Sequence, residues 1–219
     1  MPVKCKGFLF DLDGTLVDSL PVVERSWINW AKRQGVNPQE VLDFIHGKQA
    51  ITSLRHFMSG ESEERIQQEY DWLEEIESRD TDGVTALPGA VALLDRLNEL
   101  DIPWAIVTSG SIPVAYARRA AGQLPKPDVF ITAEQVSRGK PEPDAYLLGA
   151  QKLGLAVSDC VVVEDAAAGI LSGLSAGCQV IAVNAPQDAP KLELVDLNLT
   201  SLVQIRVEKE GEYAVIHAL

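Results

Sequence analysis

Five short apolar runs, each bounded by turn-forming residues, constrain the fold of this chain more than any other feature of its sequence. They are rich in Val, Ile and Phe, as strands that are buried on both faces usually are. Helical patterns occupy the gaps between the later runs, and this alternation predicts βαβ units. We therefore expect an α/β fold with a Rossmann-like parallel sheet core and helices on both faces. The predicted strands are residues 7–10, 104–108, 129–132, 160–163 and 179–183, and the predicted helices are residues 88–100, 143–153 and 166–176.

The segment between the first two predicted strands has a different character. From about residue 19 to residue 79 it contains helical patterns without a strand candidate, and it holds Trp27, Trp30 and Trp72. A helical insertion of this length after the first strand predicts a separate cap. We expect an α/β catalytic core of residues 1–17 and 83–219 and a helical cap domain of residues 18–82. Residues 202–207 and 213–219 are predicted to form a terminal β-hairpin.

Two aspartates directly follow the first predicted strand, in Asp11-Leu12-Asp13-Gly14-Thr15. Ligands of open α/β sheets bind at the carboxyl ends of the strands, and side chains two residues apart on an extended strand point the same way. Two such carboxylates repel each other unless a cation lies between them, so the motif predicts a divalent metal. An ordinary Asp-Gly turn would explain Asp13, but not the charge of Asp11 against a buried strand.

A second acidic pair, Glu164-Asp165, follows the predicted strand 160–163. A single aspartate that caps a helix after a strand is common. Two strands that each end in neighbouring carboxylates would place four acids on one edge of the sheet. A bound metal is the simplest reason for such an arrangement.

Candidate phosphate-binding residues lie between the two acidic pairs. Thr108 and Ser109 end the strand 104–108, where hydroxyl and backbone N–H groups suit phosphate oxygens, although Ser-Gly-Ser loops are also common without a ligand. Lys140 lies between Gly139 and Pro141, which restrict the backbone and direct the side chain. The alternative for Lys140 is a solvated lysine in a turn.

Composition narrows the classes of function. The formal net charge is −13 and the dense charge runs are acidic, so nucleic acid is not an expected partner. No apolar stretch approaches the roughly 18 residues of a membrane span, and no signal peptide is recognisable. Cys5, Cys160 and Cys178 are too widely spaced for a zinc or redox motif. We expect a cytoplasmic monomer that binds small molecules and does not bind a membrane.

The motifs together resemble a known family. In chain order, the Asp11–Thr15 motif, Ser109, Lys140 in Gly-Lys-Pro-Glu-Pro-Asp, and the Glu164-Asp165 pair resemble the four motifs of the haloacid dehalogenase-like hydrolases. The insertion resembles the helical cap of their best-known subclass, so the resemblance spans the whole chain. It implies a Mg²⁺-dependent phosphatase that hydrolyses small sugar phosphates through an aspartyl-phosphate intermediate.

The resemblance also implies a role for each motif residue. Asp11 would be the nucleophile and a metal ligand, and Asp13 would be the general acid and then the general base. Asp13 would also bind Mg²⁺, through its backbone carbonyl. Ser109 and Lys140 would bind the transferring phosphoryl group. Asp165 would be the remaining metal ligand, with Glu164 an outer partner. Dehalogenases of the superfamily lack the second aspartate, so Asp13 argues against dehalogenation.

One cap segment, His46-Gly47-Lys48-Gln49, is expected to lie over the active site. Similar sugar-phosphate and glycerol-phosphate phosphatases carry a His-Gly pair there, followed by an arginine two residues past the glycine. Gln49 takes the place of that arginine, which makes Lys48 the candidate substrate contact. The alternative is that His46 packs at a helix end and that Lys48 is solvated.

Three other functions remain to be weighed. A β-phosphoglucomutase-like sugar phosphomutase resembles this chain in all four motifs, but carries basic cap residues where Val23 and Ile76 stand here. A non-enzymatic regulator on this fold would have no need of the catalytic aspartates. A phosphonate-cleaving enzyme would need a cap lysine that forms a Schiff base, and the cap offers Lys32 and Lys48.

Overall fold

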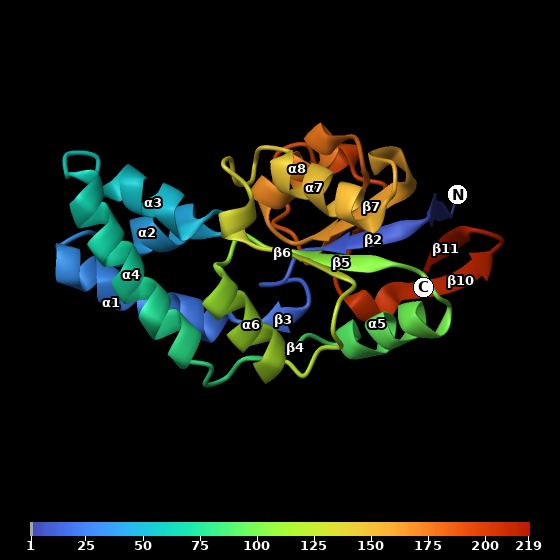
Figure 1. Cartoon of the computed structure of the whole chain (residues 1–219), viewed down its shortest axis with the longest axis horizontal. Helices are drawn as coiled ribbons and strands as arrows, with labels where there is room; N and C mark the ends of the chain where they lie inside the picture. The colour runs from blue at the N-terminus through green and yellow to red at the C-terminus, as the bar shows by residue number, and fades with distance from the viewer. Residues whose placement is uncertain (1) are drawn as a thin grey trace.

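The computed structural model describes residues 2–219, with a six-stranded parallel sheet at its centre (Figure 1). The strand order is β6-β5-β2-β7-β8-β9, so the direction of winding reverses between β2 and β7. Open α/β sheets bind ligands at the carboxyl ends of the strands on either side of such a reversal. The strands are β2 (Gly7–Phe10), β5 (Trp104–Val107), β6 (Val129–Ile131), β7 (Cys160–Glu164), β8 (Gln179–Val183) and β9 (Leu197–Leu199).

Helices cover both faces of this sheet, which confirms the predicted fold class. Alternation along β2 sends Phe8 and Phe10 into the apolar cluster beneath α5 and α6, and sends Leu9 into the cluster beneath α7 and α8. Each face thus has its own core, and the central strands are buried on both sides. The four helices are α5 (Ala90–Glu99), α6 (Ile112–Ala121), α7 (Asp144–Leu153) and α8 (Ala167–Ala176).

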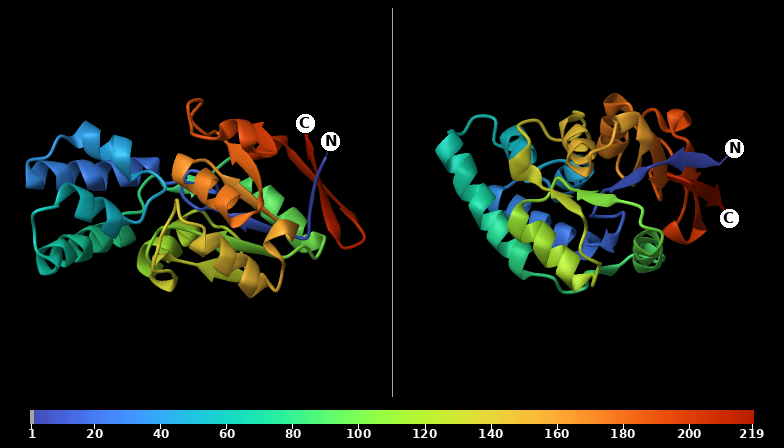
Figure 2. Two further views of the ribbon diagram at one scale, coloured as in Figure 1. Left: turned by 90° about the horizontal axis from the view of Figure 1, so that it is seen from above. Right: turned by 45° about the vertical axis from the view of Figure 1, so that its right-hand side comes forward.

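The predicted helical insertion forms four helices at one end of the molecule (Figure 1, Figure 2). They are α1 (Leu20–Gln34), α2 (Pro38–Ile45), α3 (Ala50–Phe57) and α4 (Glu63–Arg79), called the cap below. The cap has its own apolar core around Trp30, Leu54 and Leu73. Helix α4 of the cap also packs against α6, one of the helices that cover the sheet. The boundaries 18 and 82 of the cap domain stay a prediction.

The chain enters and leaves the cap through two very short strands. β3 (Val17–Asp18) pairs antiparallel with β4 (Thr85–Ala86), with Val17 opposite Ala86 and Asp18 opposite Thr85. Both crossings are therefore joined by one ladder of backbone hydrogen bonds.

The terminal hairpin is confirmed, but its first strand begins later than predicted. It consists of β10 (Ile205–Glu210) and β11 (Tyr213–Ala218), and β1 (Val3–Cys5) pairs with β11. The predicted start at residue 202 is wrong because Ser201 and Gln204 form a capping box that makes residues 202–204 a 3₁₀ turn. The short 3₁₀ helices are η1 (Ala133–Gln135), η2 (Val157–Asp159), η3 (Leu192–Leu194) and η4 (Leu202–Gln204).

Among residues 2–219, no helix combines the length and the apolar character that a membrane crossing requires.

Candidate active site

The predicted site residues come together at the carboxyl ends of three neighbouring strands. Asp11 follows β2, Thr108 follows β5, and Glu164 ends β7. Because β2 lies between β5 and β7, these ends meet where the strand order reverses. Lys140 comes from the loop before α7 and reaches the same point.

Lys140 lies at the centre of this group and is fully buried. Its Nζ lies 2.7 Å from Asp11 Oδ1 and 2.7 Å from Glu164 Oε1, and it donates a hydrogen bond of 2.9 Å to the carbonyl oxygen of Val107. Although burial alone would lower the pKa of Lys140, the carboxylates of Asp11 and Glu164 raise it above its usual value. The lysine is therefore a fixed positive charge, and the alternative of a solvated turn lysine is wrong.

Asp11, Glu164 and Asp165 form an acidic cluster around this lysine. One carboxylate oxygen from each lies within 4.8 Å of the others. Burial, followed by the neighbouring charge of Glu164, raises the pKa of Asp11 well above its usual value and raises that of Asp165 to about 7. Thr15 donates a hydrogen bond of 2.9 Å to Asp165. The single positive charge of Lys140 therefore does not balance the negative charge of the cluster.

Glu164 is held more tightly than the other two acids. Its Oε1 accepts hydrogen bonds from Lys140 and from the hydroxyl of Tyr146 at 2.6 Å, and its Oε2 accepts from the backbone N–H groups of Asp165 and Ala166. The carboxylate also fills the space beside Gly169, where an added Cβ would lie 1.6 Å from Oε1. Glu164 is thereby locked in one orientation.

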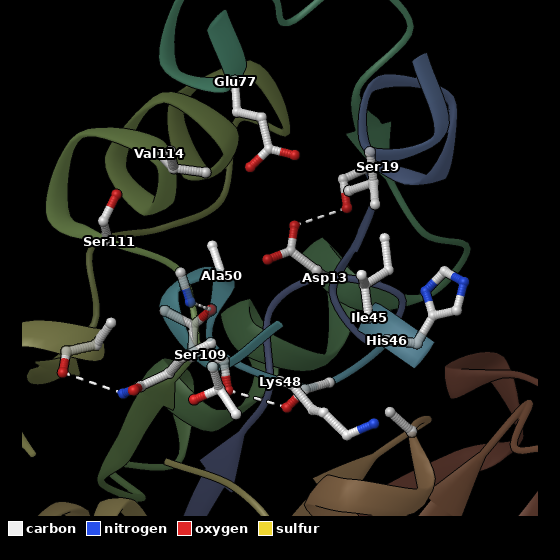
Figure 3. Close-up of a pocket in the computed structure, with 18 of the residues that line it drawn as sticks. Asp13, Ser19, Ile45, His46, Lys48, Ala50, Glu77, Ser109, Ser111 and Val114 are labelled. Carbon is white, nitrogen blue, oxygen red and sulfur yellow. Dashed lines mark hydrogen bonds between the residues drawn. The ribbon is translucent and has the colours of Figure 1, made fainter. Parts of the chain in front are cut away.

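Asp13 is not part of this cluster, and its carboxylate lies beside Ser19, which directly precedes cap helix α1 (Figure 3). Ser19 donates a hydrogen bond of 2.6 Å to its Oδ1, and Nη1 of Arg118 lies 2.9 Å from the same atom. The positive charge of Arg118 thus lies directly beside the Asp13 carboxylate, and a metal ion between the side chains of Asp11 and Asp13 stays a prediction. Gly14, in the same motif as Asp11 and Asp13, has φ of +84°, and a Cβ at this position would lie 2.2 Å from Oδ2 of Asp165.

The hydroxyl groups at the end of β5 connect the sheet to the cap. Thr108 Oγ1 accepts a hydrogen bond of 3.0 Å from the N–H of Gly110, and Ser109 Oγ donates one of 3.0 Å to the carbonyl oxygen of Gly47. Gln49 adds a second link, from its Nε2 to the carbonyl oxygen of Ala133 at 3.2 Å. The cap segment of residues 46–49 therefore lies against the sheet, in the predicted place.

Lys48 lies at the wall of the same space, but its amine does not point at the acidic cluster. Nζ donates a hydrogen bond of 2.5 Å to the carbonyl oxygen of Phe44 and lies 3.7 Å from the centre of the Phe44 ring. Partial burial lowers the pKa of Lys48. A substrate contact by Lys48 stays a prediction.

A cavity of about 600 Å³ lies between the sheet and the cap. Its volume is within the range of small-molecule sites. Asp11, Asp13, Thr108, Ser109 and Asp165 line it from the sheet, and Lys48 lines it from the cap.

Comparison with known proteins agrees with this geometry. The family model of the haloacid dehalogenase-like hydrolases matches residues 5–177. The chain belongs to this family.

Relatives of the hydrolase include characterised phosphatases of similar length. It is 69% identical to hexitol phosphatase A of Escherichia coli K12 over 98% of this chain and 99% of the relative. It is 30% identical to glycerol-1-phosphate phosphohydrolase 1 of Saccharomyces cerevisiae, over 97% of this chain and 88% of that protein. The crystal structure of a hydrolase from Pseudomonas syringae superimposes with a TM-score of 0.81 at 26% identity, over 90% of this chain and 94% of the other. The hydrolase described here is a phosphatase.

The acidic cluster of the hydrolase fits a divalent metal, which members of this family generally use. Its donors are carboxylate oxygens, the ligands that hard cations prefer. The raised pKa values of Asp11 and Asp165 indicate that positive charge beyond that of Lys140 would stabilise their ionised forms.

Several residues of the site escaped the sequence analysis. Ser19 and Arg118 contact Asp13, Tyr146 holds Glu164, and Glu77 of the cap reaches to 3.5 Å from Arg118. Arg118 and Arg119 together match the basic last turn of a helix, which is an ordinary surface feature. Nothing in a single sequence distinguishes the buried Arg118 from the half-buried Arg119.

Proposed function

We propose that this phosphatase hydrolyses small sugar phosphates, including those of open-chain polyols, with Asp11 as the nucleophile. The observation that carries this proposal is the buried contact of 2.7 Å between Lys140 and Asp11, which lines a cavity large enough for a small phosphate ester. The printed names of the relatives, a hexitol phosphatase and a glycerol-1-phosphate phosphohydrolase, support the substrate class.

The first half of the proposed reaction transfers phosphate to the protein. A carboxylate oxygen of Asp11 attacks phosphorus, and the bond between phosphorus and the sugar oxygen breaks. Asp13, which carries a proton at this stage, gives it to the departing alkoxide, while Ser19 and Arg118 hold the carboxyl group in position through Oδ1. Lys140 stays protonated throughout and balances the charge of the phosphoryl oxygens, to which Ser109 donates a hydrogen bond.

The second half releases inorganic phosphate. Asp13, now deprotonated, takes a proton from water, which attacks the phosphorus of the aspartyl-phosphate and restores Asp11. Asp11, Asp165 and the carbonyl group of Asp13 would hold Mg²⁺, with Glu164 as an outer partner. When bound, the ion neutralises negative charge on the transferred phosphoryl group.

The mutase alternative finds little support in the cap. Val23 lines the cavity at one of the two positions where a basic residue would be needed, and Ile76 is not among its lining residues. The basic cap residues at the cavity are Lys48 and Arg55, and Arg55 is paired with Glu63 at 2.8 Å.

A phosphate-release assay tests the proposal. Purified protein should release phosphate from sorbitol 6-phosphate, glucose 6-phosphate and glycerol 1-phosphate. EDTA should abolish the activity and added Mg²⁺ should restore it. Full turnover in metal-free buffer would contradict the metal requirement, and conversion of β-glucose 1-phosphate into glucose 6-phosphate would support a mutase.

The cellular location, the oligomeric state and the motion of the cap are also proposals. We propose that it works in the cytoplasm, because its three cysteines are free and buried, as is usual in a reducing compartment. We further propose that it is a monomer, and that residues 18–82 act as a lid that opens for product release. Size-exclusion chromatography with light scattering checks whether the protein is a monomer.

A further inference from the structure

The cavity extends from Asp13 to a group of polar side chains where cap helix α4 lies against α6. Glu77 comes from α4, and Ser111 and Arg118 come from the start and the last turn of α6. All three line the same cavity as Asp11. In Figure 3, Glu77 and Ser111 lie on one side of Asp13, and Ser109 and Lys48 lie on the other. Glu77 and Ser111 therefore lie across Asp13 from Ser109, and Arg118 contacts Asp13 between them.

These three side chains are buried without using their full hydrogen-bonding capacity. The side chains of Glu77 and Arg118 are only 9% and 5% exposed, and the two lie 3.5 Å apart. Among residues 2–219, Glu77 Oε1, Ser111 Oγ, and Nε and Nη2 of Arg118 have no well-aligned hydrogen-bond partner. Glu77 Oε1 and Arg118 Nη2 are the two atoms of this long ion pair, so Ser111 Oγ and Arg118 Nε are the atoms of the group left without a well-aligned partner, whereas most buried polar groups in folded proteins are paired.

Helix capping does not account for the unpaired hydroxyl of Ser111. Ser111 is the N-cap residue of α6, yet its hydroxyl caps no backbone N–H of the helix. Serine at this position usually makes such a bond and stabilises the helix by it. Asp13 contacts only one nitrogen of the Arg118 guanidinium, Nη1. The spare donors and acceptors all belong to residues that line the cavity.

We propose that Glu77, Ser111 and Arg118 form a subsite for the hydroxyl groups at the end of the substrate remote from its phosphate. This inference rests on the proposed function and assigns part of its specificity. Hydroxyl groups both donate and accept, as this mixed set of an acid, an alcohol and a guanidinium requires. A second phosphate or carboxylate is disfavoured, because Asp13 and Glu77 already balance Arg118 and would repel another anion.

The subsite should discriminate by hydroxyl content. A site built to hydrogen-bond a hydroxyl group rejects analogues that lack it, since its buried polar atoms are then left unpaired. We therefore compare sorbitol 6-phosphate with p-nitrophenyl phosphate, which has no hydroxyl groups beyond its phosphate. The measured quantity is the ratio of their kcat/KM values.

Two variants remove the proposed contacts. Ser111→Ala should lower the ratio roughly threefold to tenfold, and Glu77→Leu roughly tenfold or more. Glu75→Leu is the matched control, because Glu75 lies on the same helix, is exposed and pairs with Arg79 outside the cavity. It should leave the ratio at the wild-type value. Equal losses on both substrates for Ser111→Ala and Glu77→Leu would overturn the subsite.

A second measurement separates this inference from the proposed function. Free sorbitol should inhibit the wild-type hydrolysis of p-nitrophenyl phosphate competitively, and severalfold more weakly in both cavity variants. This result supports the subsite even where sugar phosphates prove poor substrates, an outcome that would count against the proposed function alone. Inhibition that is the same in wild type, Ser111→Ala and Glu77→Leu overturns the subsite, even where sugar phosphates are hydrolysed well.

Discussion

At the scale of single residues, the chemistry of the site depends on how Asp11 and its neighbours share charge. Asp11 is buried beside one cation, Lys140, while Glu164 and Asp165 add negative charge. Asp13, only two residues away, is balanced by Arg118. The two aspartates of one motif thus have separate partners, as a nucleophile and a proton carrier need.

Replacing Asp11 with Asn should abolish phosphate release, because an amide does not attack phosphorus. We expect a loss of roughly a thousandfold or more, with the fold intact. Because burial and the charge of Glu164 raise the pKa of Asp11, the variant should also melt at a higher temperature than the wild type in metal-free buffer. Steady-state kinetics and thermal melts check both points. A variant that keeps more than a trace of activity would place the nucleophile elsewhere.

The stability of the protein should depend on pH through Glu77. Burial raises the pKa of Glu77 from 4.5 to about 7, although Arg118 opposes this shift. A raised carboxyl pKa favours the folded state at low pH, and this contribution is lost as the pH rises from about 4.5 to 7. Glu77→Gln removes the dependence, so the variant should gain roughly 2 to 3 kcal/mol over the wild type between pH 5 and pH 8.

Urea unfolding at the two pH values measures this difference. Glu75→Gln, which changes an exposed residue of the same helix, should show no such trend. A constant difference between Glu77→Gln and the wild type across this range would mean that Glu77 is ionised in the folded protein throughout.

At the scale of elements, the first turn of α8 must approach β7 very closely. Gly169 lies in this turn, and Glu164 occupies the space of its missing side chain. Gly169→Ala should therefore displace the carboxylate of Glu164 from Lys140 and destabilise the protein by about 1 to 3 kcal/mol. Activity should fall with it.

Thermal melts and phosphate release test this effect. Gly60→Ala is the control, because a Cβ at Gly60 would meet no atom within 4 Å. A Gly169→Ala variant with wild-type stability and activity would show that Glu164 has room to move.

The elements that carry the motifs were predictable, and those that complete the site were not. The apolar run before Asp11 and the one before Glu164 each indicate a buried strand with acids at its end, and the sheet order brings them together. The helix α6, which carries Arg118, has only a modest apolar face, and β9 has three residues. Contacts such as that between Arg118 and Glu77 join residues far apart in sequence, and depend on how α4 packs on α6.

At the scale of the whole molecule, two hydrogen bonds hold the cap segment of residues 46–49 against the sheet. One joins Ser109 to Gly47 and the other joins Gln49 to Ala133. Gln49→Ala removes the second, and we expect KM to rise roughly twofold to tenfold with a smaller change in kcat, because closure over the substrate becomes less favourable.

Gln39→Ala is a suitable control for this prediction, because Gln39 is exposed and bonds only within α2. Steady-state kinetics on one sugar phosphate and on p-nitrophenyl phosphate compare the variants. An unchanged KM for Gln49→Ala would indicate that this contact does not contribute to closure.

The pairing of β3 with β4 limits how a lid could swing. Two separate linkers would allow the cap to twist and tilt freely, but here both chain crossings are tied into one small ribbon. Such a ribbon acts as a single hinge, and the cap can rotate about it in one direction. The ribbon itself would move little, while residues 46–49, on the side of the cap that faces the sheet, would move away from Ser109 and Ala133. One rotation of the cap would then break both hydrogen bonds at once and open the whole cavity.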